Sequence, residues 1–220
     1  MNSQLKSFLN LLNKNKVQYW IDSGTLLGLV RDGDVLINDK DIDIGIHESQ
    51  IDKISQLESK FIKHKYKYRY EFYNGEICKY KLYPQNKNNF LTIDINVYRE
   101  KNKDFLWCPL TFFIKPENFI FKHVQKIIKF FWRRVFKTVE TNKFPYNKIK
   151  KNYTWVIPYK YYKNIIFNQD LFCYMFKEKE EYLNYRYKNW KLKVENWDTF
   201  KDDGGVILKA PQKFISEKII

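Results

Sequence analysis

Three carboxylates at alternate positions are the feature of this sequence that most directly indicates chemistry. Asp39, Asp41 and Asp43 are spaced so that an extended strand would project all three side chains to one face. The opposite, buried face would carry Ile42, Ile44 and Ile46. Like charges this close repel each other unless a cation lies between them, and Mg²⁺ usually takes one or two carboxylates together with substrate phosphates. The pattern therefore predicts a metal-dependent site for phosphoryl-type chemistry.

A solvated acidic edge strand is the alternative interpretation of these aspartates, but a second run of residues favours the metal site. Residues 90–98 alternate between apolar and polar side chains and carry Asp94 on the polar face. A carboxylate inside such a run is costly unless it is paired or bound to a metal. We therefore expect Asp41, Asp43 and Asp94 to be the catalytic residues, with Asp94 acting as a ligand or as the base for an acceptor hydroxyl. The predicted metal ligands are Asp39, Asp41, Asp43 and Asp94, with Asp39 either a further ligand or an outer contact.

A turn of small residues precedes the carboxylates. Gly24 and Thr25 lie at the predicted start of a short helix over residues 25–30, whose backbone N–H groups could hold a phosphate. Simple N-capping by Ser23 and Thr25 fits these residues equally well. The sequence alone leaves both interpretations of the turn open.

Basic residues give the chain a net charge of +15, which suits a partner rich in phosphate. A nucleotide-activated donor, an anionic membrane and nucleic acid all fit, and a solubilising surface is the alternative. Arg31 and one of Lys79 or Lys81 are candidates for holding donor phosphates, because Arg offers bidentate geometry. The two lysines could equally be solvated positions on a strand.

Two segments of the chain resemble the LicD/fukutin branch of the nucleotidyltransferase-fold superfamily. The first comprises GTLLG at residues 24–28, then Arg31 and the three alternating aspartates. The second comprises YLNYRYKNW at residues 182–190 and WDTFKDDG at 197–204, which is similar to the closing segment of that family. The chain departs from the family pattern at Ile37-Asn38, where Pro-Trp is usual, at Lys40, where an acidic residue is usual, and at Lys188, where Gly is usual.

The resemblance implies a metal-dependent transferase that moves a phospho-alcohol, such as phosphocholine or ribitol phosphate, from a CDP-activated donor onto a cell-surface glycan. It implies Mg²⁺, with Mn²⁺ as the alternative, and a glycan or lipid-linked glycan as acceptor. The donor-binding residues expected are Gly24, Thr25, Arg31, Lys79, Lys81, Asp202 and Asp203. Without the resemblance, Asp202-Asp203-Gly204 would be interpreted as an ordinary turn.

Two other functions fit parts of the sequence. A nucleotidyltransferase that moves a nucleoside monophosphate from an NTP to a small molecule or RNA would use the same turn and carboxylates, and only the C-terminal segment argues against it. A non-catalytic basic protein that binds membrane or nucleic acid would leave the ordered carboxylates unexplained. Nucleic acid is therefore not the partner we expect.

The composition fits a reduced, intracellular protein with a packed core. Hydrophobic residues make up 44% and aromatic residues 19% of the 220 residues. Cys78, Cys108 and Cys173 are scattered and show no zinc-binding spacing. Residues 1–16 do not resemble a signal peptide, and no apolar run approaches the ~18 residues of a spanning helix. We expect a cytoplasmic protein, with peripheral contact at the inner face of the membrane as a further option.

The order of expected elements predicts an α+β fold, with a small nucleotidyltransferase-like mixed sheet packed with helices. Helices are expected over 3–15, 48–63 and 178–188, a hairpin over 66–73 and 76–83, and strands over 19–22, 90–98 and 155–159. Residues 1–110 would form the catalytic core. Residues 111–220 would form a mainly helical region that completes the donor and acceptor site.

Residues 116–140 alternate aromatic, aliphatic and basic side chains at helical spacing. Such a helix could lie on an anionic membrane, and the predicted membrane contact is assigned to residues 117–140. An ordinary core-facing helix with a basic outer side is the alternative, and general experience with amphipathic helices favours it.

Overall fold

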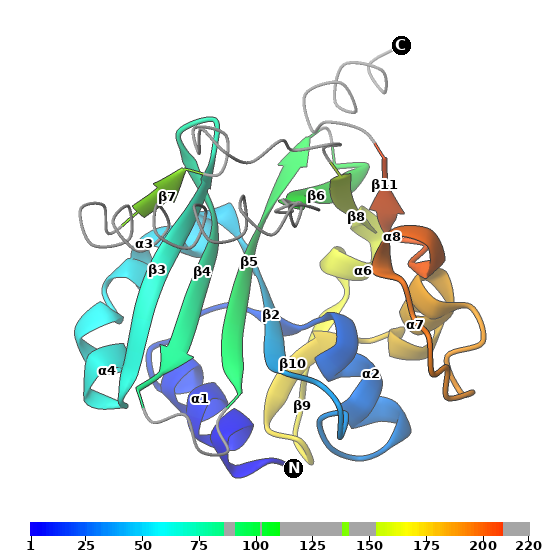
Figure 1. Ribbon diagram of the computed structural model, residues 1–220, viewed down its shortest axis with the longest axis horizontal. Coiled ribbons are helices and arrows are strands. Elements are labelled where there is room, and N and C mark those ends of the chain that lie inside the picture. Colours follow the sequence, from blue (N-terminus) through cyan, green and yellow to red (C-terminus); the bar gives the residue numbers. More distant parts are fainter. Residues whose placement is uncertain (86–90, 102, 111–137, 141–152, 209–220) are drawn as a thin grey trace, which may run out of the picture.

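The computed structural model of the chain describes residues 1–85, 91–101, 103–110, 138–140 and 153–208 (Figure 1). Its helices are α1 (Ser3–Lys14), α2 (Ser23–Arg31), η1 (Glu48–Gln50), α3 (Ile51–Ser55), α4 (Glu58–Lys63), α6 (Tyr159–Lys163), α7 (Lys179–Tyr187) and α8 (Thr199–Asp202). Its strands are β1 (Trp20–Ile21), β2 (Asp41–His47), β3 (Tyr66–Tyr73), β4 (Glu76–Pro84), β5 (Thr92–Lys101), β6 (Phe105–Leu110), β7 (Thr138–Glu140), β8 (Tyr153–Pro158), β9 (Ile165–Asn168), β10 (Cys173–Phe176) and β11 (Val206–Ile207).

One large mixed sheet organises these elements, as the α+β class predicts. Its strands follow the order β11-β8-β6-β5-β4-β3-β7, and β2 pairs with β5 and with β1 on a second branch. Strands β9 and β10 form a separate antiparallel pair. Figure 1 shows α2 next to the C-terminal elements, and α2 contacts α7 directly. In the described part of the chain, no helix is long and apolar enough to cross a membrane.

The parallel pair β2 and β5 lies at the centre of the molecule. The isoleucines of β2 and the apolar residues of β5 form one buried face, and Ile42, Ile44, Ile46, Ile93, Ile95 and Val97 are all fully buried. Alternation then turns the polar residues of both strands to the other face. The predicted acidic strand is confirmed from Asp41 onward. Asp39 precedes the strand and lies in the loop that leads into it.

The N-terminal helix is confirmed almost to the residue. Its apolar stripe buries Leu5, Phe8, Leu9 and Leu12 in the core, and the Asn2 side chain caps it by accepting hydrogen bonds from the next turn. The helix predicted over 48–63 is instead divided into η1, α3 and α4. The division falls at Gln56 and Leu57, between α3 and α4.

The hairpin of β3 and β4 is also confirmed. Asn74 and Gly75 form its turn with φ angles of 51° and 83°, the left-handed conformation that a two-residue hairpin loop requires. The hairpin continues the sheet beyond β5, because β4 pairs with β5 and brings Lys79 and Lys81 beside it. Two predicted phosphate-binding lysines are thereby placed next to Asp94.

The C-terminal region contains strands beside helices in its described part, where the sequence indicated mainly helix. Strands β8 and β11 extend the large sheet from β6, and α7 follows β10. Of the basic helix predicted over 116–140, only residues 138–140 are described, and they form β7, parallel to β3. The helix prediction is wrong for these three residues, and the remainder lies outside the described residues. The division of the chain at residue 110 stays a prediction.

Candidate active site

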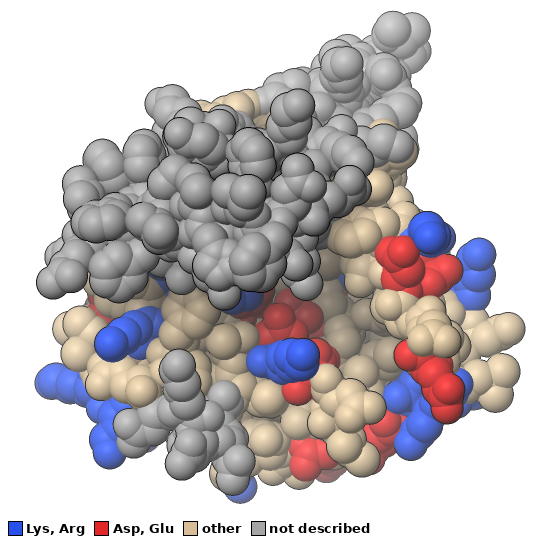
Figure 2. All heavy atoms as spheres, viewed as in Figure 1, with Lys and Arg blue, Asp and Glu red and all other residues tan. Residues whose placement is uncertain are grey.

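A cavity of about 760 Å³ lies where the start of α2, the strands β2 and β5, and the C-terminal segment meet. Figure 2 shows acidic side chains gathered near the middle of the face of the molecule that it draws. Predicted site residues that line the cavity are Gly24, Arg31, Asp39, Asp41, Asp43, Lys79, Asp94 and Asp203. The cavity therefore brings together predicted residues from near both ends of the chain, from Gly24 to Asp203.

Asp43 and Asp94 are direct neighbours across the two parallel strands, since they are register partners. Asp94 is 3% exposed, and its Oδ2 accepts hydrogen bonds from Lys79 Nζ at 2.9 Å and Lys81 Nζ at 2.8 Å. Its Oδ1 is buried and has no hydrogen-bond partner among the described residues. Asn96 Nδ2 lies 3.5 Å from Asp43 Oδ1. The two lysines thus donate hydrogen bonds to Asp94, and neither donates one to Asp43.

The pKa values follow from this asymmetry. Burial, the neighbouring Asp41 and then Asp94 raise the pKa of Asp43 well above its ordinary value. Burial also opposes ionisation of Asp94, but Lys79 and Lys81 outweigh it and hold the pKa of Asp94 below its usual value. Burial and Asp41 raise the pKa of Asp39 to about 6. The cluster therefore resists carrying all its negative charges at once.

The aspartates fit a divalent cation on two observations. Their mutual repulsion is what a cation would relieve, and the unpartnered Oδ1 of Asp94 is an oxygen ligand of the kind that Mg²⁺ prefers. Within the described ranges, no three His, Cys, Asp or Glu side chains are placed so that they could hold a metal ion as they stand. Binding would have to draw Asp41, Asp43 and Asp94 together, with Asp39 beside them.

The start of α2 and its N-cap residue Asp22 hold the acidic strand in place. The Thr25 hydroxyl accepts a hydrogen bond from the Asp43 backbone N–H at 2.8 Å, and the Asp22 N–H donates to the Asp43 carbonyl at 3.2 Å. Both backbone groups of Asp43 are therefore fixed. Thr25 is fully buried and is not among the residues that line the cavity. Its hydroxyl therefore holds the backbone of β2. Gly24 does line the cavity, and a Cβ there would lie 2.7 Å from Asp39 Oδ2.

The remaining predicted donor-binding residues differ in whether they line the cavity and in which residues they bind. Arg31 lines the cavity, but its guanidinium binds the neighbouring Asp32 carboxylate at 2.9 Å and 3.0 Å. Lys81 reaches Asp94 but does not line the cavity. Asp202 accepts from the Asp198 N–H at 2.8 Å and stays outside the cavity lining. Asp203 lines the cavity and is buried.

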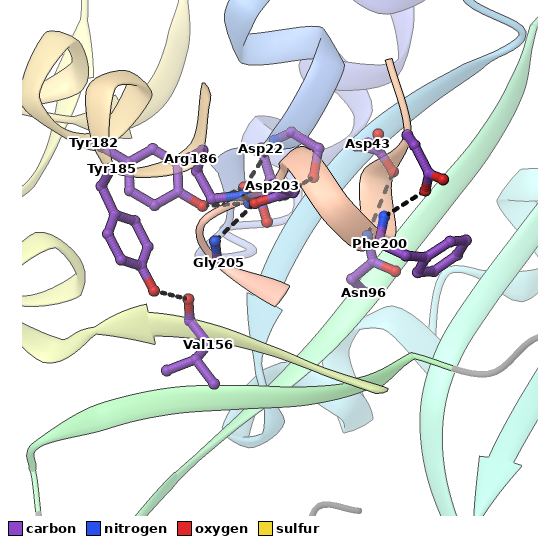
Figure 3. A network of polar contacts seen from close by, with 12 residues as sticks. Asp22, Asp43, Asn96, Val156, Tyr182, Tyr185, Arg186, Phe200, Asp203 and Gly205 are labelled. Carbon is purple, nitrogen blue, oxygen red and sulfur yellow. Dashed lines mark hydrogen bonds and ion pairs between the residues drawn. The ribbon is translucent and has the colours of Figure 1, made fainter. Parts of the chain in front are cut away.

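Sequence reasoning assigned no role to Asp22 and Arg186, which are both buried beside the cavity. Figure 3 shows Arg186 between Asp22 and Asp203. Its Nε and Nη2 donate to the Asp203 carboxylate at 2.6 Å and 2.5 Å, and its Nη1 lies 3.3 Å from Asp22 Oδ1. Arg186 lies inside the second segment that carries the family resemblance, and Asp22 lies two residues before the first. Spacing could not pair them, because 164 positions separate Asp22 from Arg186.

Aromatic side chains form a further part of the cavity wall. They come from β8, from the end of α7, from the segment that follows it and from α8, and they are Trp155, Tyr187, Trp190, Trp197 and Phe200. The rings of Tyr187 and Trp197 are 5.0 Å apart, and Trp197 is 36% exposed. The cavity therefore joins an acidic wall suited to a cation with an aromatic wall suited to a flat ring.

Several proteins are similar to this chain. A protein of Rickettsia prowazekii (strain Madrid E), described as uncharacterized, is 40% identical over 122 residues, which is 54% of this chain and 41% of that protein. An uncharacterized protein of Rickettsia typhi (strain ATCC VR-144 / Wilmington) is 52% identical over 48 residues, or 21% of this chain and 16% of that protein. The chain thus spans well under two thirds of the length of these relatives. Among solved structures, the lincomycin-bound lincosamide antibiotic adenylyltransferase LnuA is 20% identical, with a TM-score of 0.37 over 49% of this chain and 61% of that one.

The match that decides the family covers the turn, the acidic strand and β5. Residues 16–130 match the family described as LicD/FKTN/FKRP, nucleotidyltransferase domain. This range is more than half of the chain and contains Asp22, Gly24, the four predicted metal ligands and the two lysines that bind Asp94. The chain therefore belongs to the LicD/FKTN/FKRP family of nucleotidyltransferase domains.

Proposed function

We propose that this protein is a metal-dependent transferase that moves a phospho-alcohol from a CDP-activated donor onto a glycan. The observation that carries the proposal is the in-register pair Asp43 and Asp94, which lies in a cavity between the turn of α2 and the C-terminal segment. Family membership supports a transferase of phosphate-containing groups. The choice of a CDP-alcohol as donor and a glycan as acceptor follows from the resemblance of the two segments, at residues 24–43 and 182–204, to that family.

The acidic wall would hold the cation. Asp41, Asp43 and Asp94 are the ligands we propose for Mg²⁺ or Mn²⁺, with Asp39 at their edge. When bound, the cation neutralises charge on the donor's pyrophosphate. Lys79 stays charged beside Asp94, because Asp94 and Glu71 outweigh the cost of burial and raise its pKa. Its ammonium group then lies at the cavity wall, where it can orient a phosphate oxygen.

The proton of the acceptor hydroxyl needs a base, and the cavity offers two candidates. Asp94 is the poorer one, because two lysines hold its pKa low and so favour its role as a ligand. Asp39 is better suited, since burial and Asp41 raise its pKa, to about 6 in the metal-free cavity, and so favour the uptake of a proton. We therefore place Asp94 among the ligands and assign proton uptake to the Asp39 carboxylate.

The aromatic wall would take a ring of one of the two substrates. Tyr187 and Trp197 present a paired aromatic surface, and stacking of a base or of a sugar face on such rings is typically worth ~1–3 kcal/mol. Arg31 would reach the donor's phosphates only after leaving Asp32, which makes it a secondary contact in this proposal. Peripheral membrane contact through residues 117–140 stays a proposal without structural support, because residues 117–137 lie outside the described ranges.

The test is release of CMP from a panel of CDP-alcohols carrying choline, ribitol, glycerol or ethanolamine, with Mg²⁺ or with a chelator. Asp41→Asn and Asp43→Asn should abolish release. Asp52→Asn, at an exposed carboxylate on α3 that does not line the cavity, should not change it. Pyrophosphate formed from an NTP, with no CDP-alcohol consumed, would replace this proposal with nucleotide transfer.

A further inference from the structure

Arg186 is an arginine with 1% exposure, and it is enclosed by charged and polar partners. Besides its two bonds to Asp203, its Nη1 donates to the Tyr182 hydroxyl at 2.8 Å and its Nη2 lies 3.4 Å from Ser23 Oγ. Its guanidinium thus binds α7, the turn after α8 and the start of α2 at the same time. The planar five-donor fork of arginine suits such a junction, whereas a lysine could not reproduce it.

Asp22 connects this junction to the acidic strand. Its carboxylate is fully buried and accepts from the Tyr98 hydroxyl at 2.7 Å, from the Tyr182 hydroxyl at 2.8 Å and from the Ser23 N–H at 2.7 Å. Its own N–H holds the Asp43 carbonyl. A shift of Asp22 would therefore be transmitted directly to Asp43, which is a ligand in the proposed cation site.

Ser23 is the strained residue of this turn. Its φ is 49°, a left-handed conformation that is uncommon outside glycine and that persists where the surroundings enforce it. Contacts of Ser23 with Asp22 and Arg186 supply that enforcement. The next residue, Gly24, lies so close to Asp39 that a Cβ there would require the Asp39 carboxylate to move. The strained turn therefore places its backbone against a second carboxylate of the cluster.

A buried ion pair is weak evidence for stability, because desolvation offsets most of the attraction. Removing one partner is nevertheless costly, since it leaves an uncompensated charge in the interior. Here one arginine, Arg186, contacts two buried aspartates, Asp22 and Asp203. Loss of its guanidinium would remove a charged partner from both carboxylates. Fixing a geometry is the role that these contacts support best.

We propose that Arg186 is a positioning residue that sets the Ser23–Gly24 turn, and through Asp22 the backbone of Asp43, for cation binding in the cavity. Through this contact the C-terminal segment would determine whether the acidic strand is correctly placed. The proposal rests on the proposed function only in naming the cation. The positioning itself is a property of the folded chain.

The test compares three variants on the full chain. Arg186→Lys keeps the charge and loses the fork, and Tyr182→Phe removes the hydroxyl that touches both Asp22 and Arg186. Glu181→Gln is the matched control, because Glu181 lies on the same helix in an exposed ion pair with Lys160. Two readouts are used: direct Mn²⁺ binding by electron paramagnetic resonance, and the backbone amide resonances of Ser23, Gly24 and Asp43.

We expect Arg186→Lys to weaken Mn²⁺ binding about 10- to 100-fold, the usual effect of losing a partner that orients metal ligands. Tyr182→Phe should weaken it about 3- to 10-fold, as the loss of one hydrogen bond implies. In both variants the three amide resonances should shift, whereas Glu181→Gln should leave binding and resonances as in the wild type.

A folded Arg186→Lys variant with unchanged resonances and Mn²⁺ binding within about twofold of wild type would overturn the proposal. If Arg186→Lys does not fold, the same criteria applied to Tyr182→Phe decide the matter. If the wild type binds no Mn²⁺, the metal-dependent function fails, and the amide resonances alone decide whether Arg186 positions the turn.

Discussion

Asp43 and Asp94 are register partners on adjacent parallel strands, yet their pKa values are displaced in opposite directions. Two lysines donate hydrogen bonds to Asp94, whereas at Asp43 burial, Asp41 and Asp94 outweigh the attraction of Lys79. The pair therefore combines one carboxylate whose ionisation the lysines favour with one whose ionisation its surroundings oppose. If the proposed cation binds here, its charge would favour the ionised form of Asp43.

Asp43→Asn should abolish transfer without destabilising the folded protein. The substitution removes a repelling charge, so the free energy of unfolding of the metal-free protein should stay the same or rise by up to about 1 kcal/mol, while transfer is lost. Urea denaturation in the presence of a chelator measures the first effect and CMP release the second. Asp22→Asn is the contrasting variant and should lose about 3 kcal/mol, because it leaves part of a buried ion pair uncompensated. A large loss of stability in Asp43→Asn would contradict the repulsion described here.

Asp39 should titrate with a pKa of about 6 in the metal-free protein, as followed by carbon NMR of its carboxyl group. Because the folded chain holds this proton more tightly than the unfolded chain, the contribution of Asp39 to stability is fully present below about pH 4 and is lost as the pH rises through about 6. Bound metal requires ionised carboxylates, so Mn²⁺ binding should be weaker at about pH 5 than at about pH 7.5. An Asp39 pKa near its ordinary value, with binding equal at both pH values, would remove Asp39 from the cluster.

Gly24→Ala should reduce activity without unfolding the protein. The new Cβ would lie 2.7 Å from Asp39 Oδ2, and a side-chain carboxylate can move away at little cost. We expect about a tenfold loss of transfer, since misplacing a catalytic group by about 1 Å has effects of this size or larger. Gly28→Ala offers a comparison on the same helix, because there the Cβ would meet the backbone of the following loop at 2.5 Å and should destabilise the fold. Full activity in Gly24→Ala would show that Asp39 is not needed where the structure places it.

Lys188→Gly should stabilise the protein. Lys188 ends α7 with a φ of 52°, a region that non-glycine residues adopt at a cost of ~1–3 kcal/mol. Glycine relieves this strain, although its greater freedom in the unfolded chain offsets part of the gain, so the free energy of unfolding should rise by about 1 kcal/mol. Lys191→Gly, an exposed lysine nearby without a positive φ, should instead be neutral or slightly destabilising. A gain of stability in Lys191→Gly alone would refute the assignment of strain to Lys188.

Local patterns predicted the parts of the fold in which neighbouring residues decide the structure. The Asn74-Gly75 turn, the stripe of α1 and the alternation of β2 and β5 all follow from short-range geometry, so the carboxylate pair could be anticipated. Thr25 and Arg186 show why the rest could not. The Thr25 hydroxyl binds the Asp43 N–H because β2 passes beside it. Arg186 contacts Asp22 because the C-terminal segment returns to α2. Such long-range packing is set by the whole tertiary structure and leaves no periodic signal.

The most direct test of the central claim is a phosphorus NMR time course with CDP-alcohols, Mg²⁺ and an oligosaccharide acceptor. If Asp43 and Asp94 hold the cation that serves phospho-alcohol transfer, the pyrophosphate signals of one donor will be replaced by CMP with the wild type. They will persist with Asp43→Asn and when Mg²⁺ is chelated. CMP release that is unaffected by both the substitution and the chelator would contradict the account.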